Sequence, residues 1–348
     1  MWLPGFLLGD LIWRAAQLAG AAGPTDGYDL YHEGGAALAA LVWSLLAIML
    51  TYRIARYLVS PKAATLATIT IWLGTPLLAY GFIEVDMSHS VGAFAGAALL
   101  ATTISAWRKP YLLKRWLLCG LCMGLLILIR PNHAVMFLLP LGAWLASFRS
   151  AGQERRNLSL QFGNLGAMLA SSVLVFIPQA LSWKAIFGHF LVMPQSNYFA
   201  GSGYTKLFAS LFSTQNGYFS WTPLWAVALV GVVLIPRNFR WFAGWLATVL
   251  VLEMISNAWA ADWSGGEAFG ARRLIELGPG VALGLAALFE RLKSRRLALF
   301  SLVILCCCYW NIALMCRYYS KQMPHCSAMP VADFVAGTLV SPARLLGR

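Results

Sequence analysis

Long apolar segments alternate with short polar connections along most of this 348-residue chain. Residues 2–19 differ, because they are apolar on one face and carry Asp10 and Arg14 on the other, which predicts a helix lying in the outer membrane interface. The pattern predicts an all-α, polytopic bundle of about ten transmembrane helices after this interfacial helix, although several segments are shorter than the ~20 residues that cross a bilayer upright. The expected spans lie near 36–54, 63–83, 91–107, 116–130, 133–148, 160–182, 219–236, 241–259, 277–290 and 297–315.

The connection at residues 130–133 allows two interpretations. Its Pro131 is compatible with a break inside one helix or with a turn between two helices. Basic residues flank the region on both sides, at 114–115 and 149–155. We expect a hairpin, because only a hairpin brings both basic flanks to the same side of a membrane.

Charge divides the connections into two alternating groups. One group is short and basic, and it holds most of the 26 lysines and arginines. Such loops stay in the cytoplasm, so the other group, with most of the 13 acidic residues, is expected at the extracytoplasmic face. The basic group comprises Arg53, Arg56, Lys62, Arg108, Lys109, Lys114, Arg115, Arg149, Arg155, Arg156, Arg237, Arg240, Arg291, Lys293, Arg295 and Arg296.

The composition favours a membrane protein over a soluble one. Charged residues make up 11% of the chain and hydrophobic residues 59%, with a mean hydropathy of +0.68. Soluble domains carry about 25% charged residues. The net charge of +13 is explained by the basic loops, which contact anionic headgroups of the lipid bilayer. No basic stripe interleaved with stacking aromatic residues is present, so no nucleic-acid partner is expected.

Three ionisable residues, Glu84, Asp86 and His89, lie within six positions at a predicted membrane boundary. On a helix, Asp86 and His89 would share a face. Asp86 could act as a general base or hold a divalent metal, and His89 could contact a phosphate or donate a proton. The alternative is a solvated turn between two helices. We expect a catalytic role for this group, because so short a turn more often uses Gly, Asn and Ser.

A second candidate group lies in the predicted outer loop at residues 260–277. Arg272 and Arg273 follow a Gly-Gly pair, and an arginine fork beside small residues suits a phosphate oxyanion. An interfacial anchor, or a salt bridge to Glu267 or Glu276, explains these arginines equally well. Asp262 and Glu267 are further candidates for contact with an acceptor hydroxyl or a metal.

Ionisable residues also occur at or within the predicted spans. Arg130 and His133 are candidates for binding a phosphate, and charge at membrane depth is costly and often functional. Snorkelling to the interface is the competing explanation. Glu253 lies well inside a span and is expected to pair with another helix or face a cavity.

The predicted outer loop at residues 183–218 is rich in aromatic and turn residues. Its Tyr198 and Tyr204 are candidates for contacts with the acceptor or substrate. The aromatic residues could equally form the belt that proteins place at membrane interfaces, and composition does not separate the two.

Four stretches of the chain form an ordered set of motifs. They are Thr75-Pro76-Leu77, Glu84 to Ser90, Asn216-Gly217-Tyr218-Phe219-Ser220-Trp221-Thr222-Pro223 and Gly265-Gly266-Glu267-Ala268-Phe269-Gly270-Ala271-Arg272. Together they resemble the bacterial GT-C glycosyltransferases, the polyprenyl-phosphate-sugar-dependent enzymes related to protein mannosyltransferases and aminoarabinose transferases. The likeness covers most of the chain, and the order of the motifs is more specific than any one of them.

The resemblance implies an enzyme of the bacterial inner membrane that transfers a sugar from a polyprenyl-phosphate carrier to a hydroxyl of a glycan, lipid or protein. It implies a GT-C-like domain over residues 1–316, with residues 1–35 at the outer face, and an extracytoplasmic tail over 317–348. The family's principal base, an Asp in the first outer loop, would precede Met1. Asp86 occupies the position of the family's second acidic site.

Two alternatives remain open. A carrier or flippase for a lipid-linked sugar is expected to show broken helices and polar midplane residues in two related halves. Here the ionisable groups cluster in outer loops, which favours an enzyme. The other alternative is an inactive, truncated paralogue, because the first-loop Asp is missing. No nucleotide-binding fingerprint is present, which fits a lipid-linked donor.

Overall fold

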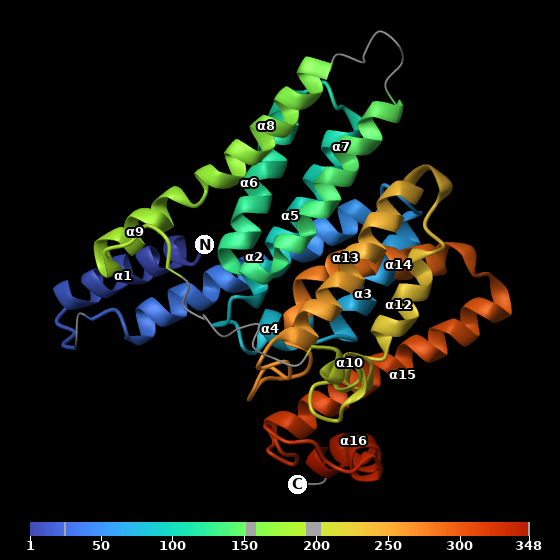
Figure 1. The fold of residues 1–348 in the computed structure, drawn as a ribbon. Coiled ribbons are helices and arrows are strands. Elements are labelled where there is room, and N and C mark those ends of the chain that lie inside the picture. Colours follow the sequence, from blue (N-terminus) through green and yellow to red (C-terminus); the bar gives the residue numbers. More distant parts are fainter. Residues whose placement is uncertain (24–25, 151–157, 193–202, 347–348) are drawn as a thin grey trace.

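A computed structural model of the chain describes residues 1–23, 26–150, 158–192 and 203–346, and within them every regular element is a helix (Figure 1). With η marking 3-10 helices, the elements are α1 (Leu3–Leu18), α2 (Leu30–Ala55), α3 (Pro61–Leu73), α4 (Leu77–Phe82), α5 (His89–Arg108), α6 (Leu113–Ile129), η1 (Pro131–Phe137), α7 (Leu138–Ser150), α8 (Leu158–Leu174), α9 (Ile177–Phe187), α10 (Gly203–Phe212), α11 (Tyr218–Trp221), α12 (Leu224–Val232), η3 (Arg237–Phe239), α13 (Arg240–Trp259), η4 (Arg272–Leu277), α14 (Gly278–Arg291), α15 (Ser294–Tyr319) and α16 (Val331–Leu346).

Five helices among the described residues are long and apolar enough to cross a membrane. The all-helical class expected from the sequence is therefore confirmed, and the protein has the features of a helical membrane protein. Other predicted spans are divided or short: proline at position 76 separates α3 from α4, and proline at 223 separates α11 from α12. The five candidate spans are Leu30–Ala55, His89–Arg108, Leu158–Phe187, Arg237–Trp259 and Ser294–Tyr319.

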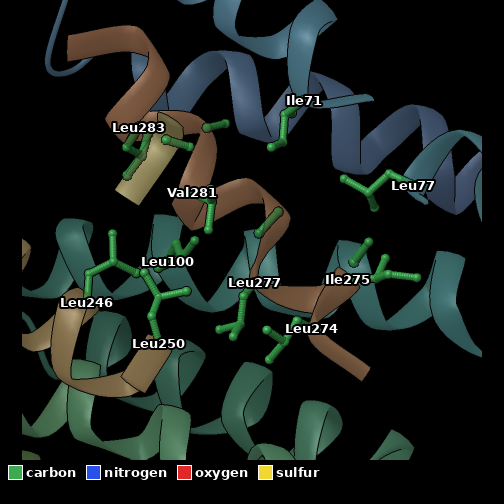
Figure 2. Packing of buried hydrophobic residues seen from close by; sticks show 14 of the residues in the cluster. Ile71, Leu77, Leu100, Leu246, Leu250, Leu274, Ile275, Leu277, Val281 and Leu283 are labelled. Atoms are coloured by element: carbon green, nitrogen blue, oxygen red, sulfur yellow. The ribbon is translucent and has the colours of Figure 1, made fainter. Parts of the chain in front are cut away.

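Helix α14 forms the centre of the core, since every residue from Gly278 to Phe289 is buried. Gly231 of α12 and Gly284 of α14 allow this dense packing. A Cβ on Gly284 would lie 2.1 Å from the Ala228 carbonyl oxygen, so α12 and α14 are in backbone contact. Figure 2 shows part of this core, including Val281 of α14 and Leu100 of α5.

The connection at residues 130–133 is a hairpin, as the basic flanks predict. Helix α6 ends at Ile129, and η1 turns the chain into α7, which runs back beside α5 and α13 (Figure 1). Trp144 Nε1 near the end of α7 donates to the Gln161 carbonyl oxygen at 2.8 Å. Pro131 fits the first position of η1, where its missing N–H is not needed.

The described parts of the basic connections gather at one end of the bundle. This sorting matches the alternation of charge along the sequence. Two ring contacts join these connections: the Arg108 guanidinium lies 5.1 Å from the centre of the Tyr57 ring, and the Trp107 and Trp241 rings lie 5.0 Å apart. Two hydrogen bonds join them as well: the Ser60 N–H donates to Glu290 Oε2 at 3.0 Å, and Asn164 Nδ2 donates to the Pro110 carbonyl oxygen at 2.7 Å.

Helix α1 packs antiparallel on the N-terminal part of α2. A Cβ on Gly5 would lie 2.0 Å from the Gly35 carbonyl oxygen, and one on Gly9 would lie 2.2 Å from that of Tyr31. The opposite face of α1 is apolar and exposed, with Leu3 and Leu11 more than half accessible. The predicted N-terminal helix is therefore present, and its exposed apolar face is consistent with an interfacial position.

The structure adds two helices that the hydropathy pattern did not predict. Helix α10 forms within residues 183–218, which were expected to be a long loop, and α16 forms in the tail. Both are amphipathic and shorter than a span, so a search for apolar runs does not detect them. Arg317 of α15 holds α16 in place by donating to the carbonyl oxygens of Asp333 and Phe334 at 3.0 and 2.9 Å.

Candidate functional site

Residues 83–88, which connect α4 to α5, lie at the end of the bundle opposite the basic connections. Helix α5 begins at this connection and ends at Arg108, among the basic residues. Elements distant in the sequence meet here. Arg130 Nη2 lies 3.3 Å from Ser88 Oγ, Arg272 Nη1 lies 3.6 Å from Met87 Sδ, and the Tyr319 hydroxyl donates to Glu84 Oε1 at 2.8 Å.

His89, the first residue of α5, is fully buried between two charged groups. Its Nδ1 lies 3.1 Å from Glu276 Oε1, and Arg130 Nη2 lies 2.9 Å from its Nε2. Arginine only donates, so Nε2 accepts, and the neutral imidazole carries its proton on Nδ1, where it donates to Glu276. Arg130 Nε lies 3.2 Å from the same carboxylate oxygen. His89 thus links a cation to an anion.

His133 extends this cluster to α13. Its Nδ1 lies 2.9 Å from Glu253 Oε1 and its Nε2 lies 3.1 Å from Glu276 Oε2. Two ring nitrogens that both face carboxylate oxygens fit the doubly protonated imidazolium. Two carboxylates are then balanced by His133 and Arg130, which is how buried charge is tolerated. We name His89, Arg130, His133, Glu253 and Glu276 the buried ionic cluster.

Glu276 is the centre of the buried ionic cluster, and its side chain is 0% exposed. Burial alone raises the pKa of a carboxyl group, but the charges of Arg130 and His133 outweigh it. They hold the pKa of Glu276 well below its usual range. The carboxylate is therefore charged at neutral pH.

Two glycines of α5 allow Glu276 to reach this position. A Cβ on Gly92 would lie 2.7 Å from Glu276 Cγ, and a Cβ on Gly96 would lie 2.4 Å from the Glu276 carbonyl oxygen. Any larger residue would push η4 away from α5. The spacing of four residues places both glycines on one face of α5, so the helix offers a groove for the η4 backbone.

Arg272 lies beside the same connection without a carboxylate partner. Among the described residues, the arginines in ion pairs are Arg14, Arg130 and Arg273. Arg272 is partly exposed and lines a shallow surface depression together with Tyr218, Asn257 and Trp263. Gly265 lies beneath its guanidinium, since a Cβ there would be 3.4 Å from Arg272 Nε. The loop thus leaves an arginine fork accessible to an anion.

Arg273 lines the same depression as Arg272, but it is paired with Asp262. Arg273 Nη2 lies 3.1 Å from Asp262 Oδ2, and Arg273 Nη1 donates to Asn257 Oδ1 at 3.2 Å. Arg273 therefore does form a salt bridge, but its partner is Asp262 and not Glu267 or Glu276 as the sequence suggested. Glu267 is exposed on the same loop. Arg273 therefore has a carboxylate partner, whereas the adjacent Arg272 has none among the described residues.

The expectation that Asp86 and His89 share a helical face is wrong. Helix α5 begins at His89, so Asp86 belongs to the preceding turn. Asp86 is exposed and forms no hydrogen bond or ion pair with another described residue, whereas His89 turns into the core. Glu84 is partly buried and bonded to Tyr319. The three residues lie in one connection but have three different environments.

The remaining candidates from the sequence are two tyrosines and a metal site. Tyr198 lies outside the described residues, and Tyr204 lies in the first turn of α10. Within the described parts of the chain, no group of three or more His, Cys, Asp or Glu side chains is arranged to hold a metal ion.

The sequence analysis did not predict that Glu276 and Tyr319 contribute to this site. Glu276 was considered only as a partner of the neighbouring arginines, yet it binds Arg130, His89 and His133 instead. An acid that directly precedes a long apolar segment was the available indication. Tyr319 had no such indication, because tyrosine at the end of an apolar helix is typical of any membrane interface.

Comparison with known proteins gave no relative: no family model, curated protein or solved structure matches the chain.

Proposed function

We propose that the protein is a GT-C-type membrane glycosyltransferase, which moves a sugar from a polyprenyl-phosphate carrier to an acceptor hydroxyl. The observation that supports this proposal most is the placement of Asp86 and Arg272. The exposed Asp86 directly precedes Met87, and Met87 Sδ lies 3.6 Å from Nη1 of Arg272, which has no carboxylate partner among the described residues. A general base and a phosphate-binding cation are the two groups that such a transfer requires.

The proposed orientation follows from the charge of the loops. Short loops rich in Lys and Arg remain in the cytoplasm, so the basic end of the bundle faces inward. Asp86, Arg272 and the buried ionic cluster then face the extracytoplasmic side of the bacterial inner membrane. A lipid-linked sugar presents its phosphate at that interface, level with Arg272.

The proposed reaction is a single displacement at the anomeric carbon. The acceptor hydroxyl oxygen forms a bond to that carbon while the bond from carbon to phosphate oxygen breaks. The hydroxyl proton passes to the Asp86 carboxylate, and polyprenyl phosphate leaves with the bonding electron pair. Arg272 stabilises the negative charge on the departing phosphate. Arg130, whose side chain is 19% exposed, adds positive charge from the rim of the buried ionic cluster.

The proposal predicts that Asp86→Asn abolishes transfer, because an amide cannot accept the hydroxyl proton. Membranes containing the full chain are incubated with radiolabelled polyprenyl-phosphate hexoses and endogenous acceptors. We expect transfer to fall about 100-fold or more in this variant, the usual effect of losing a general base. Arg272→Ala is expected to reduce transfer as well, through loss of phosphate binding.

Matched controls separate site effects from general damage. Asp333→Asn changes an exposed aspartate of α16, and Arg291→Ala removes an exposed arginine at the basic end. Both are expected to retain full transfer. Unchanged rates in Asp86→Asn and Arg272→Ala would refute the assignment of these residues. Movement of the lipid-linked sugar across the bilayer without its consumption would support a carrier instead.

A further inference from the structure

Glu84 has an unsatisfied carboxylate oxygen at the candidate site. Its Oε1 accepts the Tyr319 hydroxyl at 2.8 Å, but its Oε2 is shielded from solvent and has no hydrogen-bond partner among the described residues. Leaving a buried carboxylate oxygen without a donor is costly. A carboxylate accepts only, so the missing partner is a donor such as a hydroxyl.

The aromatic ring of Tyr319 lies beside this carboxylate. Its ring stacks on that of Phe269, with centroids 6.0 Å apart and an angle of 24° between the planes. The Phe269 carbonyl oxygen in turn accepts the Tyr80 hydroxyl at 3.1 Å, which fixes the loop below the ring. A held aromatic ring next to an unpaired carboxylate combines an apolar surface with a hydrogen-bond acceptor. This combination suits a sugar, whose C–H face is apolar and whose edge carries hydroxyl donors.

Glu84 and Arg272 carry opposite charges, so they favour different groups of a ligand. Phe269, beneath Tyr319, precedes Arg272 by three residues on the same loop, and Arg272 contacts Met87 in the same connection as Glu84. A carboxylate repels a phosphate, whereas an arginine attracts it. A ligand with a phosphate on Arg272 therefore places an uncharged, hydroxyl-bearing group against Glu84.

We propose that Glu84 and Tyr319 form the subsite for the sugar of the lipid-linked donor, with Glu84 Oε2 accepting a sugar hydroxyl. This inference rests on the proposed function, since it assumes that Arg272 holds the phosphate of the same donor. Glu84 and Tyr319 then determine which sugar is accepted, while Arg272 recognises the carrier.

The test compares two lipids that differ only in the sugar. The full chain in lipid nanodiscs is titrated with a polyprenyl-phosphate hexose and with polyprenyl phosphate alone. We expect Glu84→Gln to weaken binding of the sugar-bearing lipid about tenfold or more, the effect of losing a hydrogen bond to a charged group. Its affinity for the sugar-free lipid is expected to stay unchanged. Arg272→Ala is expected to weaken binding of both lipids.

Tyr319→Phe gives an independent measurement, because it removes a single oxygen from a partly exposed side chain. We expect it to weaken binding of the sugar-bearing lipid alone. Glu290→Gln and Tyr309→Phe are matched controls; both residues form hydrogen bonds elsewhere in the bundle, with Ser60 and with the Leu339 carbonyl oxygen. Neither control is expected to change the binding of either lipid.

The two proposals fail in different ways. If the unmodified chain binds neither lipid, the proposed function is wrong. If it binds both lipids and Arg272→Ala weakens both, but Glu84→Gln and Tyr319→Phe leave the sugar-bearing lipid unaffected, the sugar subsite is wrong. Equal losses for both lipids in these two variants would also overturn the subsite, because Glu84 would then act as a structural brace.

Discussion

At the scale of single residues, Glu276 shows how one carboxylate organises a site. It contacts Arg130, His89 and His133, which come from two other elements of the bundle. Removing one partner of a buried ion pair leaves the others uncompensated, which costs about 3–5 kcal/mol. We expect Glu276→Gln to lower the free energy of unfolding by about this amount. Thermal unfolding in detergent measures the change, and exposed Glu33→Gln serves as the control.

Glu276 also predicts a dependence of stability on pH. Its pKa in the folded protein lies well below the ordinary value of 4.5, so the folded state binds its proton less tightly than the unfolded state. The resulting stabilisation is fully present above about pH 4.5 and is lost as the pH falls through the lower, folded pKa. The stability difference between the unmodified chain and Glu276→Gln is therefore expected to shrink on acidification. A difference that stays constant from pH 7 to pH 3 would contradict this account.

At the scale of elements, contact between α12 and α14 depends on the absence of a side chain. A Cβ on Gly284 would lie 2.1 Å from a backbone oxygen of α12, so the helices would have to separate. We expect Gly284→Ala to destabilise the protein by about 1–3 kcal/mol, as overpacking of a core does. Gly244→Ala is the control, because a Cβ there meets nothing within 4 Å. Unfolding of the two variants is compared in the same detergent; equal stability would contradict the close contact.

At the scale of the whole molecule, the separation of basic connections from the candidate site predicts an orientation. A cysteine at position 267 is expected to react with an impermeant maleimide in intact cells, and one at position 293 only after lysis. The two variants, Glu267→Cys and Lys293→Cys, are made in a chain whose exposed Cys306 and Cys326 are replaced by Ser. Labelling in the reverse order would overturn the proposed extracytoplasmic site.

Much of the helical architecture could be predicted from the sequence. Apolar runs located the principal helices, and basic flanks identified the hairpin at Pro131, because hydropathy and charge are properties of each segment alone. The count of about ten spans stays a prediction, since five described helices are long and apolar enough to cross a membrane. A short segment such as α14 is buried against other helices along most of its length, and an apolar core helix resembles a membrane span in sequence.

The sequence located the candidate site but did not predict the environment of each side chain. Glu84, Asp86 and Arg272 were singled out by residue type and neighbourhood, and the structure brings them to one connection. The different environments of Arg272 and Arg273 could not be predicted, because adjacent residues of one type differ only in the direction of their side chains.

The sequence by itself determined where the long apolar helices lie and which connections carry each sign of charge, since both depend on local composition. Only the tertiary structure decided which charges meet. Glu276 joins Arg130 and His133, more than a hundred positions earlier in the chain, because Gly92 and Gly96 let two elements approach closely enough to exclude water. Burial of that kind depends on packing between helices, and no single segment carries it.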